Sequence, residues 1–238
     1  NGTICLNGQE YPMRDSLFPT IDPANPYKLT PEEESTVHKL QQTFSISEKL
    51  QQHVRFLFSK GSMYLVYNGN LLYHGCIALE EDGSFMSTKV DGRVYKGREF
   101  MDRLDRLARR GYFSTDAEEK LYGQDILWYL WTGAKSPIFG KNKMSTFERY
   151  FIADKATHYE EKNPYYALRD KEETAVTILK EFGLDPDKAH IVNGHVPVQV
   201  KKGESPIKAG GKLLVIDGGF AKAYQNITGI AGYSLIYN

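Results

Sequence analysis

The sequence predicts an α/β or α+β fold, in which strands near both ends of one sheet-based domain flank a long helical stretch. Two apolar runs flank Asn68-Gly69, apolar residues recur at helical intervals from about 96 to 184, and short apolar runs return after Asp185-Pro186. This order is typical of a helical insertion within a sheet-based domain rather than of two tandem domains. The 238 residues suffice for one large domain or two small ones.

The first sixty residues carry a strong helix signal after an irregular start. Residues 1–29 are rich in Pro, Asn and Asp and predict an irregular lead-in. Thr30 is placed to cap a helix, Pro31 suits its first position, and three glutamates follow near the positive end of the helix dipole. The helical pattern continues to about Lys60, with a break at Ser45–Ser47.

The strands are predicted from turn residues and short apolar runs. We expect strands at about 62–67 and 71–78, because Asn-Gly between two apolar runs is the strongest short hairpin signal. Further strands are expected at 190–193, 212–217 and 228–236. The expected division is a lead-in with an N-terminal helix at 1–60, sheet segments at 61–95 and 185–238, and a mostly helical insertion at 96–184.

Charge, cysteine content and hydropathy exclude several classes of partner and of protein. Lys plus Arg and Asp plus Glu balance at 30 each, so no electrostatic case exists for nucleic acid or an anionic membrane. Cys5 and Cys76 are too few for a disulfide framework and fit a reducing cytoplasm, and no apolar run is long enough to cross a membrane. The chain starts Asn1-Gly2-Thr3 without Met, which indicates a piece of a longer protein or the remnant of a tag.

Three residues with metal-binding side chains lie beside glycine where a predicted strand ends: His74, His195 and Asp217. Ligand sites in open α/β sheets form at such strand ends. Two imidazoles and a carboxylate suit Mn, Fe, Zn or Ni better than Ca. The alternatives are a satisfied core or edge histidine at His74, an ordinary loop residue at His195, and an Asx-type turn at Asp217.

Three long stretches carry a family resemblance: "VYNGNLLYHGCIAL", "KSPIFGKNKMSTFERYFIADKATHYEEKNPYY" and "IVNGHVPVQVKKGESPIKAGGKLLVIDGGFAKAYQ". Together they resemble the C-terminal part of the class III fructose-1,6-bisphosphatases, bacterial enzymes of the calcineurin-like metallophosphoesterase superfamily. The second stretch is characteristic of class III, whereas the other two are shared more widely among metallophosphatases. The resemblance covers nearly the whole chain and implies a partial metallophosphatase β-sandwich sheet.

The resemblance implies a site with two divalent metal ions, for which we expect Mn²⁺. His74 in "YHG" and His195 in "NGHVPV" match metal-binding histidines of the superfamily. Asn193, next to His195, is expected to orient that histidine or a phosphate oxygen, and Asp217 is expected to bind phosphate or substrate. The implied reaction is hydrolysis of the 1-phosphate of fructose 1,6-bisphosphate, as in gluconeogenesis. In such enzymes the ions activate the attacking water and stabilise charge on the departing oxygen.

A bisphosphate substrate also requires a second anion site away from the metal ions. Lys141, Lys143 and Arg149, with Lys135 nearby, are the basic candidates, and a helix starting at Ser145 or Thr146 could help to hold a phosphate. The alternative is that these side chains are ordinary solvated charges.

The superfamily's other metal motifs do not occur in the 238 residues, and none of the six histidines is followed by Glu. We therefore expect the catalytic residues upstream of this chain, which alone should be inactive and should self-associate or pair with the missing N-terminal half. Two other functions stay open: another phosphoesterase of the same superfamily, or a non-catalytic regulatory or oligomerisation fragment.

Overall fold

The chain divides into two compact units, and the computed structural model describes residues 2–236. The first unit takes in the residues up to Gly61 together with Ser145–Tyr159, and the second takes in Ser62–Met144 and the chain from Glu160 onward. Residues 145–159, from the middle of the expected helical insertion, thus belong to the first unit. Both candidate histidines lie in the second. The division expected from the sequence stays a prediction.

The first unit opens with a hairpin that the sequence reasoning missed. Strands β1 (Thr3–Leu6) and β2 (Gln9–Pro12) pair antiparallel, with Leu6 opposite Gln9. Asn7 and Gly8 form the turn at φ 52° and 81°, which is the geometry that Asn-Gly turns favour. The expected irregular lead-in is therefore wrong for these residues, although Asn7-Gly8 is the same signal that identified the later hairpin.

The helix start and the break predicted in this unit are confirmed. Helix α1 (Pro31–Ile46) begins after Thr30, whose side chain and that of Glu33 form a reciprocal capping box. Ser47 separates it from α2 (Glu48–Lys60) and accepts from the Leu50 N–H at 3.3 Å. The unit also contains α5 (Thr146–Phe151) and a 3-10 turn at Lys155–His158.

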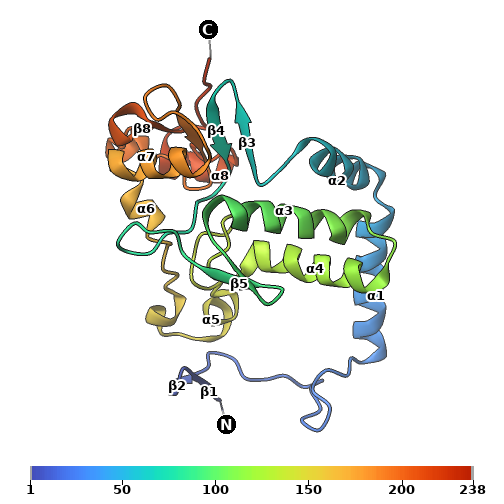
Figure 1. The fold of residues 1–238 in the computed structure, drawn as a ribbon. Coiled ribbons are helices and arrows are strands. Elements are labelled where there is room, and N and C mark those ends of the chain that lie inside the picture. The colour runs from blue at the N-terminus through green and yellow to red at the C-terminus, as the bar shows by residue number, and fades with distance from the viewer. Residues whose placement is uncertain (1, 237–238) are drawn as a thin grey trace. The chain divides into compact units, whose positions relative to one another are not determined.

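The second unit contains a five-stranded sheet with a parallel centre (Figure 1). Its strands, in spatial order, are β3 (Tyr64–Tyr67), β4 (Asn70–Tyr73), β7 (Ile191–Asn193), β9 (Leu213–Val215) and β8 (Ile207–Lys208). The pairs β4–β7 and β7–β9 are parallel, while β3 and β8 are antiparallel edge strands. The mixed sheet confirms the α/β prediction, and only β8 was not expected.

Two predicted strands differ from the structure. The strand expected to reach residue 78 ends at Tyr73, because the Cys76 N–H donates to the Pro137 carbonyl at 2.8 Å and not to a neighbouring strand. The strand expected at 228–236 is absent from the part of the chain that the structure describes. Helix α8 (Lys222–Thr228) ends there at Gly229, φ 99°, and only one bridge, from Asp217 to Gly232, follows.

Further helices and a small hairpin belong to the same unit as this sheet. The helices are α3 (Gly97–Phe113), α4 (Ala117–Thr132), α6 (Tyr165–Leu168) and α7 (Glu172–Glu181), and the small hairpin, β5 (Thr88–Val90) and β6 (Arg93–Tyr95), precedes α3. Helices α3 and α4 run side by side (Figure 1). Ile178 and Leu179 of α7 belong to the same buried cluster as Leu71, Ile191 and Leu213 of the sheet. The apolar face of α7 therefore anchors the strands that carry the candidate site.

Candidate metal site

The parallel pairing of β4 and β7 brings the two candidate histidines together. Tyr73 pairs with Asn193 at the carboxyl ends of these strands, so His74 and His195 follow at the same edge of the sheet. The Nε2 atom of His74 lies 3.1 Å from Nδ1 of His195, and their rings meet edge to face with centroids 5.0 Å apart. Residues 121 positions apart thus form one pair of imidazoles.

The orientation of His195 is set by a backbone carbonyl and by an unusual backbone conformation. Its Nε2 lies 3.1 Å from the carbonyl oxygen of Phe139, and since a carbonyl only accepts, Nε2 carries the proton and Nδ1 keeps its lone pair. Metal-binding histidines commonly donate their other ring N–H to such a carbonyl. His195 has φ 63°, a left-handed conformation that is uncommon for residues other than glycine but enriched in histidine.

Both imidazoles are disposed to be neutral. Partial burial lowers the pKa of His74, and the nearby Asp217 carboxylate offsets part of that shift. Partial burial also lowers the pKa of His195, and the neighbouring His74 lowers it further. Neutral imidazole is the form that binds metal ions, so both shifts favour the binding form.

The spacing of the two nitrogens fits a shared ion. Two nitrogens bound to one ion at about 2.0–2.1 Å and about 90–109° lie roughly 2.8–3.4 Å apart, and the observed separation is 3.1 Å. An ion that replaced the proton on Nε2 of His74 would contact both rings. Imidazole suits first-row transition metals. Across residues 2–236, however, no group of three or more His, Cys, Asp or Glu side chains is arranged to hold a metal ion.

Asp217 reaches the same edge of the sheet, two residues after β9. A Cβ placed on Gly194 would lie 3.8 Å from the Asp217 Cβ and 3.8 Å from Nδ1 of His74, which puts the carboxylate beside the pair. Its Oδ1 accepts from the Gly219 N–H at 2.7 Å, which is the contact of an Asx-type turn. Its contact with substrate stays a prediction.

Asn193 is turned inward from this edge. Its side chain is 1% exposed, and its Nδ2 lies 2.6 Å from the Gly75 carbonyl oxygen and 3.2 Å from that of His74. The expectation that Asn193 contacts a phosphate oxygen stays a prediction.

The comparisons with known proteins identify the family. The model of the Firmicute fructose-1,6-bisphosphatase family matches residues 1–238. This chain belongs to that family. It is 60% identical to a class 3 fructose-1,6-bisphosphatase of Clostridium botulinum (strain Alaska E43 / Type E3) and 61% identical to one of Clostridioides difficile (strain 630). The whole chain is matched in both, but it spans only 36% of the length of each relative. No solved structure matches it.

The basic candidates of this Firmicute fructose-1,6-bisphosphatase family member are divided between the two units. Lys141 Nζ lies 5.7 Å from the ring centroid of Phe139, whose carbonyl contacts His195, and it pairs with Glu160 at 2.6 Å. Lys143 is half-buried in the second unit. Arg149 belongs to the first unit, where it donates to the Ser145 Oγ and the His158 carbonyl at 3.0 Å each. Their roles stay predictions.

Two parts of this site were not foreseen from the sequence. The Phe139 carbonyl fixes the His195 ring, and the neighbouring Pro137 carbonyl passes so close to Gly75 that a Cβ there would lie 2.1 Å from its oxygen. "KSPIFG" carries turn residues, but nothing in it shows which strand end it will contact.

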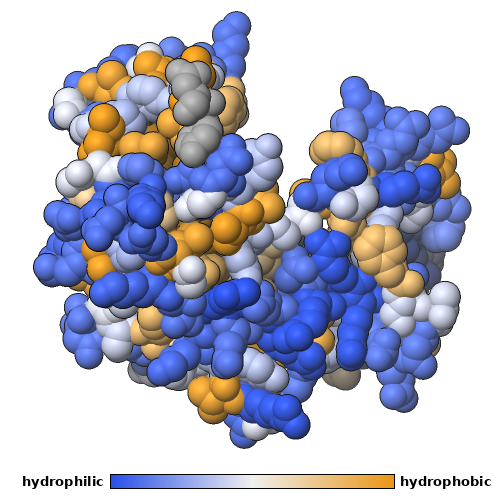
Figure 2. All heavy atoms as spheres, turned by 45° about the horizontal axis from the view of Figure 1, so that its top comes forward, coloured by the Kyte–Doolittle hydropathy of each residue, from blue (hydrophilic) through white to orange (hydrophobic). Residues whose placement is uncertain are grey.

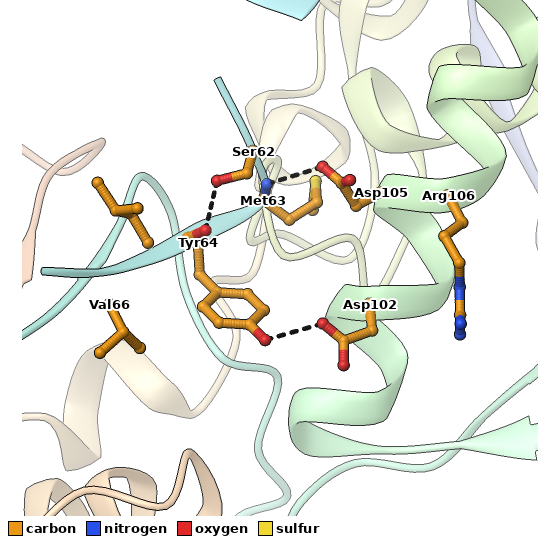
Figure 3. Close-up of a pocket in the computed structure, with 8 residues that line it drawn as sticks. Ser62, Met63, Tyr64, Val66, Asp102, Asp105 and Arg106 are labelled. Atoms are coloured by element: carbon orange, nitrogen blue, oxygen red, sulfur yellow. Dashed lines mark hydrogen bonds between the residues drawn. The ribbon is translucent and has the colours of Figure 1, made fainter. Parts of the chain in front are cut away.

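A pocket of about 390 Å³ lies elsewhere in the second unit, between β3 and α3 (Figure 3). The Tyr64 hydroxyl donates to Asp102 Oδ1 at 2.8 Å, and the Met63 N–H donates to Asp105 Oδ1 at 3.2 Å. None of the candidate residues lines it, and its carboxylates already accept hydrogen bonds within the chain. None of the described helices has the length and apolar character needed to cross a membrane.

Proposed function

We propose that this chain is part of a metal-dependent phosphatase that hydrolyses the 1-phosphate of fructose 1,6-bisphosphate. The observation that carries the proposal is the pair of imidazoles, His74 and His195, with nitrogens 3.1 Å apart in a chain of the Firmicute fructose-1,6-bisphosphatase family. The two class 3 relatives named above share about 60% of the residues.

His74 and His195 would hold one of the metal ions, for which we propose Mn²⁺. When bound, the divalent ions supply a Lewis acid that stabilises negative charge on the phosphoryl oxygens. The chain's own contribution is to hold the two ring nitrogens close together: the Phe139 carbonyl keeps the proton of His195 on Nε2, and partial burial lowers the pKa of both rings, which favours their neutral form. The histidines are two ligands of a larger set, so we expect the isolated 238-residue chain to lack turnover.

The proposal is tested with a hybrid in which this chain replaces the matching residues of the Clostridioides difficile relative. We expect Mn²⁺-dependent release of phosphate from fructose 1,6-bisphosphate by the hybrid and none by the isolated chain. His74→Ala or His195→Ala should lower kcat/KM by at least about 100-fold, since loss of a ligand's supporting contacts alone costs 10–100-fold.

His190→Ala is the matched control, because His190 is an exposed histidine at the opposite end of β7. It should leave kcat/KM unchanged. Full activity of both histidine variants, or steady turnover by the isolated chain, would contradict the proposal.

Lys141 is the basic residue that we propose for the second phosphate, because it lies in the same unit as the histidines and its Nζ lies 5.7 Å from the ring of Phe139, whose carbonyl contacts His195. In the hybrid, Lys141→Ala should raise KM for fructose 1,6-bisphosphate by roughly 10-fold, since a hydrogen bond to a charged group contributes about 1.5–3 kcal/mol. KM for a fructose 1-monophosphate should change little. Lys188→Ala, at an exposed lysine paired with Asp185, is the control. If Lys141→Ala raised KM equally for both substrates, this role of Lys141 would be wrong.

The sheet also offers a surface for a partner. Strand β3 is an edge strand whose side chains Leu65, Val66 and Tyr67 are 51%, 42% and 64% exposed, and hydrophobic side chains reach the surface in several places (Figure 2). Exposed apolar edge strands favour association. We propose that this edge pairs with the remainder of the enzyme or with a second copy, and a strictly monomeric isolated chain in sedimentation would exclude the second copy.

A further inference from the structure

Asn193 occupies a buried position directly behind the histidine pair. It is the last residue of β7, it pairs with Tyr73 across the parallel strands, and its side chain is 1% exposed. Its backbone is held on the other side by the Ile216 N–H, which donates to the Asn193 carbonyl at 2.9 Å. The side chain points toward the end of β4.

The amide of Asn193 donates to the segment that carries His74. Its Nδ2 lies 2.6 Å from the carbonyl oxygen of Gly75, 3.2 Å from that of His74 and 3.4 Å from that of Tyr73. Three successive carbonyls thus converge on one donor group where β4 ends. Few other side chains could do this, because an amide nitrogen provides two N–H donors and a carboxylate of the same shape provides none.

The oxygen of the same amide, Asn193 Oδ1, indicates that the hydrogen bonds of Nδ2 determine how the side chain is placed. The Asn193 Oδ1 is buried, and no group of residues 2–236 donates a hydrogen bond to it. A buried acceptor without a partner costs free energy, so the placement is retained for what Nδ2 does. The backbone adds one contact between the same segments, from the Gly194 N–H to the His74 carbonyl at 3.0 Å.

We infer that Asn193 is a positioning residue for His74. By binding the carbonyls of residues 73–75, its amide fixes where the chain leaves β4, and with it the place of the His74 ring opposite His195. The inference deepens the proposed function and rests on the metal role assigned to the two histidines. It assigns Asn193 an inward, indirect role rather than a contact with substrate.

The test uses the full 238-residue chain, with its histidines followed by long-range ¹H–¹⁵N spectra and Mn²⁺ as the probe. In the wild-type chain, Mn²⁺ should broaden the ring signals of His74 and His195 before those of the other four histidines. Asn193→Asp, which keeps the shape and removes both donors, should shift both ring signals and weaken the Mn²⁺ response by about 10- to 100-fold. Asn193→Ser, too short to reach the Gly75 carbonyl, should do the same and guards against a folding defect peculiar to the aspartate.

Asn70→Ala is the matched control, because Asn70 bridges the same strands at their other end by accepting from the His190 N–H at 2.9 Å. It should leave the His74 and His195 signals and the Mn²⁺ response unchanged. If the Asn193 variants lower the free energy of unfolding but leave the ring signals and the Mn²⁺ response as in the wild type, the positioning role is wrong.

His74→Ala separates the inference from the proposed function. If Mn²⁺ broadens His195 equally in the wild type and in His74→Ala, the metal role of the pair fails. The ring signals of the Asn193 variants, recorded without Mn²⁺, still decide whether Asn193 positions His74.

Discussion

Gly75→Ala is expected to lower the free energy of unfolding by about 3 kcal/mol or more and to displace the His74 segment. A Cβ at this position would lie 2.1 Å from the Pro137 carbonyl oxygen and 3.0 Å from that of Ile138. Both neighbours are backbone atoms, and the Cys76 N–H donates to the same Pro137 oxygen at 2.8 Å, so the contact cannot relax without loss of that bond. Overpacking of this kind costs about 1–3 kcal/mol and occasionally more. Urea denaturation measures the loss.

Gly194→Ala is the matched control, because Gly194 also adjoins a histidine of the pair. A Cβ there would meet nothing closer than the His74 carbonyl oxygen at 3.5 Å, an ordinary contact, and its φ is not left-handed. We expect its free energy of unfolding to change by less than about 1 kcal/mol. If Gly75→Ala and Gly194→Ala lowered the free energy of unfolding equally, the close approach of the Pro137 segment would not be what requires glycine at position 75.

Gly123→Ala is expected to have the second large effect, on the pairing of α3 and α4. A Cβ on Gly123 would lie 2.1 Å from the backbone nitrogen of Gly111 and 2.8 Å from the Leu107 carbonyl oxygen. The two helices touch backbone to backbone at this crossing, so the alanine must push them apart. We expect a loss of about 3 kcal/mol, since the affected atoms belong to a tightly packed core.

The sign of this result is decisive. Within an isolated helix, replacing glycine by alanine stabilises by about 0.8–1.0 kcal/mol, so helix propensity and packing predict opposite outcomes. Gln124→Ala, at the next residue and on the exposed side of α4, is the control and should change stability by less than about 0.5 kcal/mol. A more stable Gly123→Ala chain in urea denaturation would refute the tight crossing.

Local sequence signals predicted much of the fold. The capping residue Thr30, the break near Ser47 and the turn at Asn68-Gly69 all lie where the structure has them. Each acts through neighbours only a few residues away, such as the Glu33 carboxylate that accepts from the Thr30 N–H at 2.8 Å. Signals of this range are fully present in the sequence. Asn7-Gly8, the turn of the β1–β2 hairpin, is one of them.

The missed strand boundaries have longer-range causes. The second strand of the first predicted pair ends at Tyr73, where the carbonyls of residues 73–75 accept from Asn193, 118–120 positions away, and the Cys76 N–H donates to Pro137. An apolar run such as that from Leu71 to Leu79 is compatible with a strand and with a buried loop alike. Only the partner of each N–H and carbonyl distinguishes them.

The sequence by itself determined which side chains could bind a metal ion: His74 and His195, beside glycines at strand ends, in a chain similar to a known family. Only the tertiary structure decided that their nitrogens lie 3.1 Å apart, that the Phe139 carbonyl leaves Nδ1 of His195 with its lone pair, and that Asn193 faces inward. The physical reason is that the capacity of a side chain to bind a metal ion depends on its residue type alone. The direction and tautomer of that side chain depend on hydrogen bonds to segments that only the folded sheet brings together.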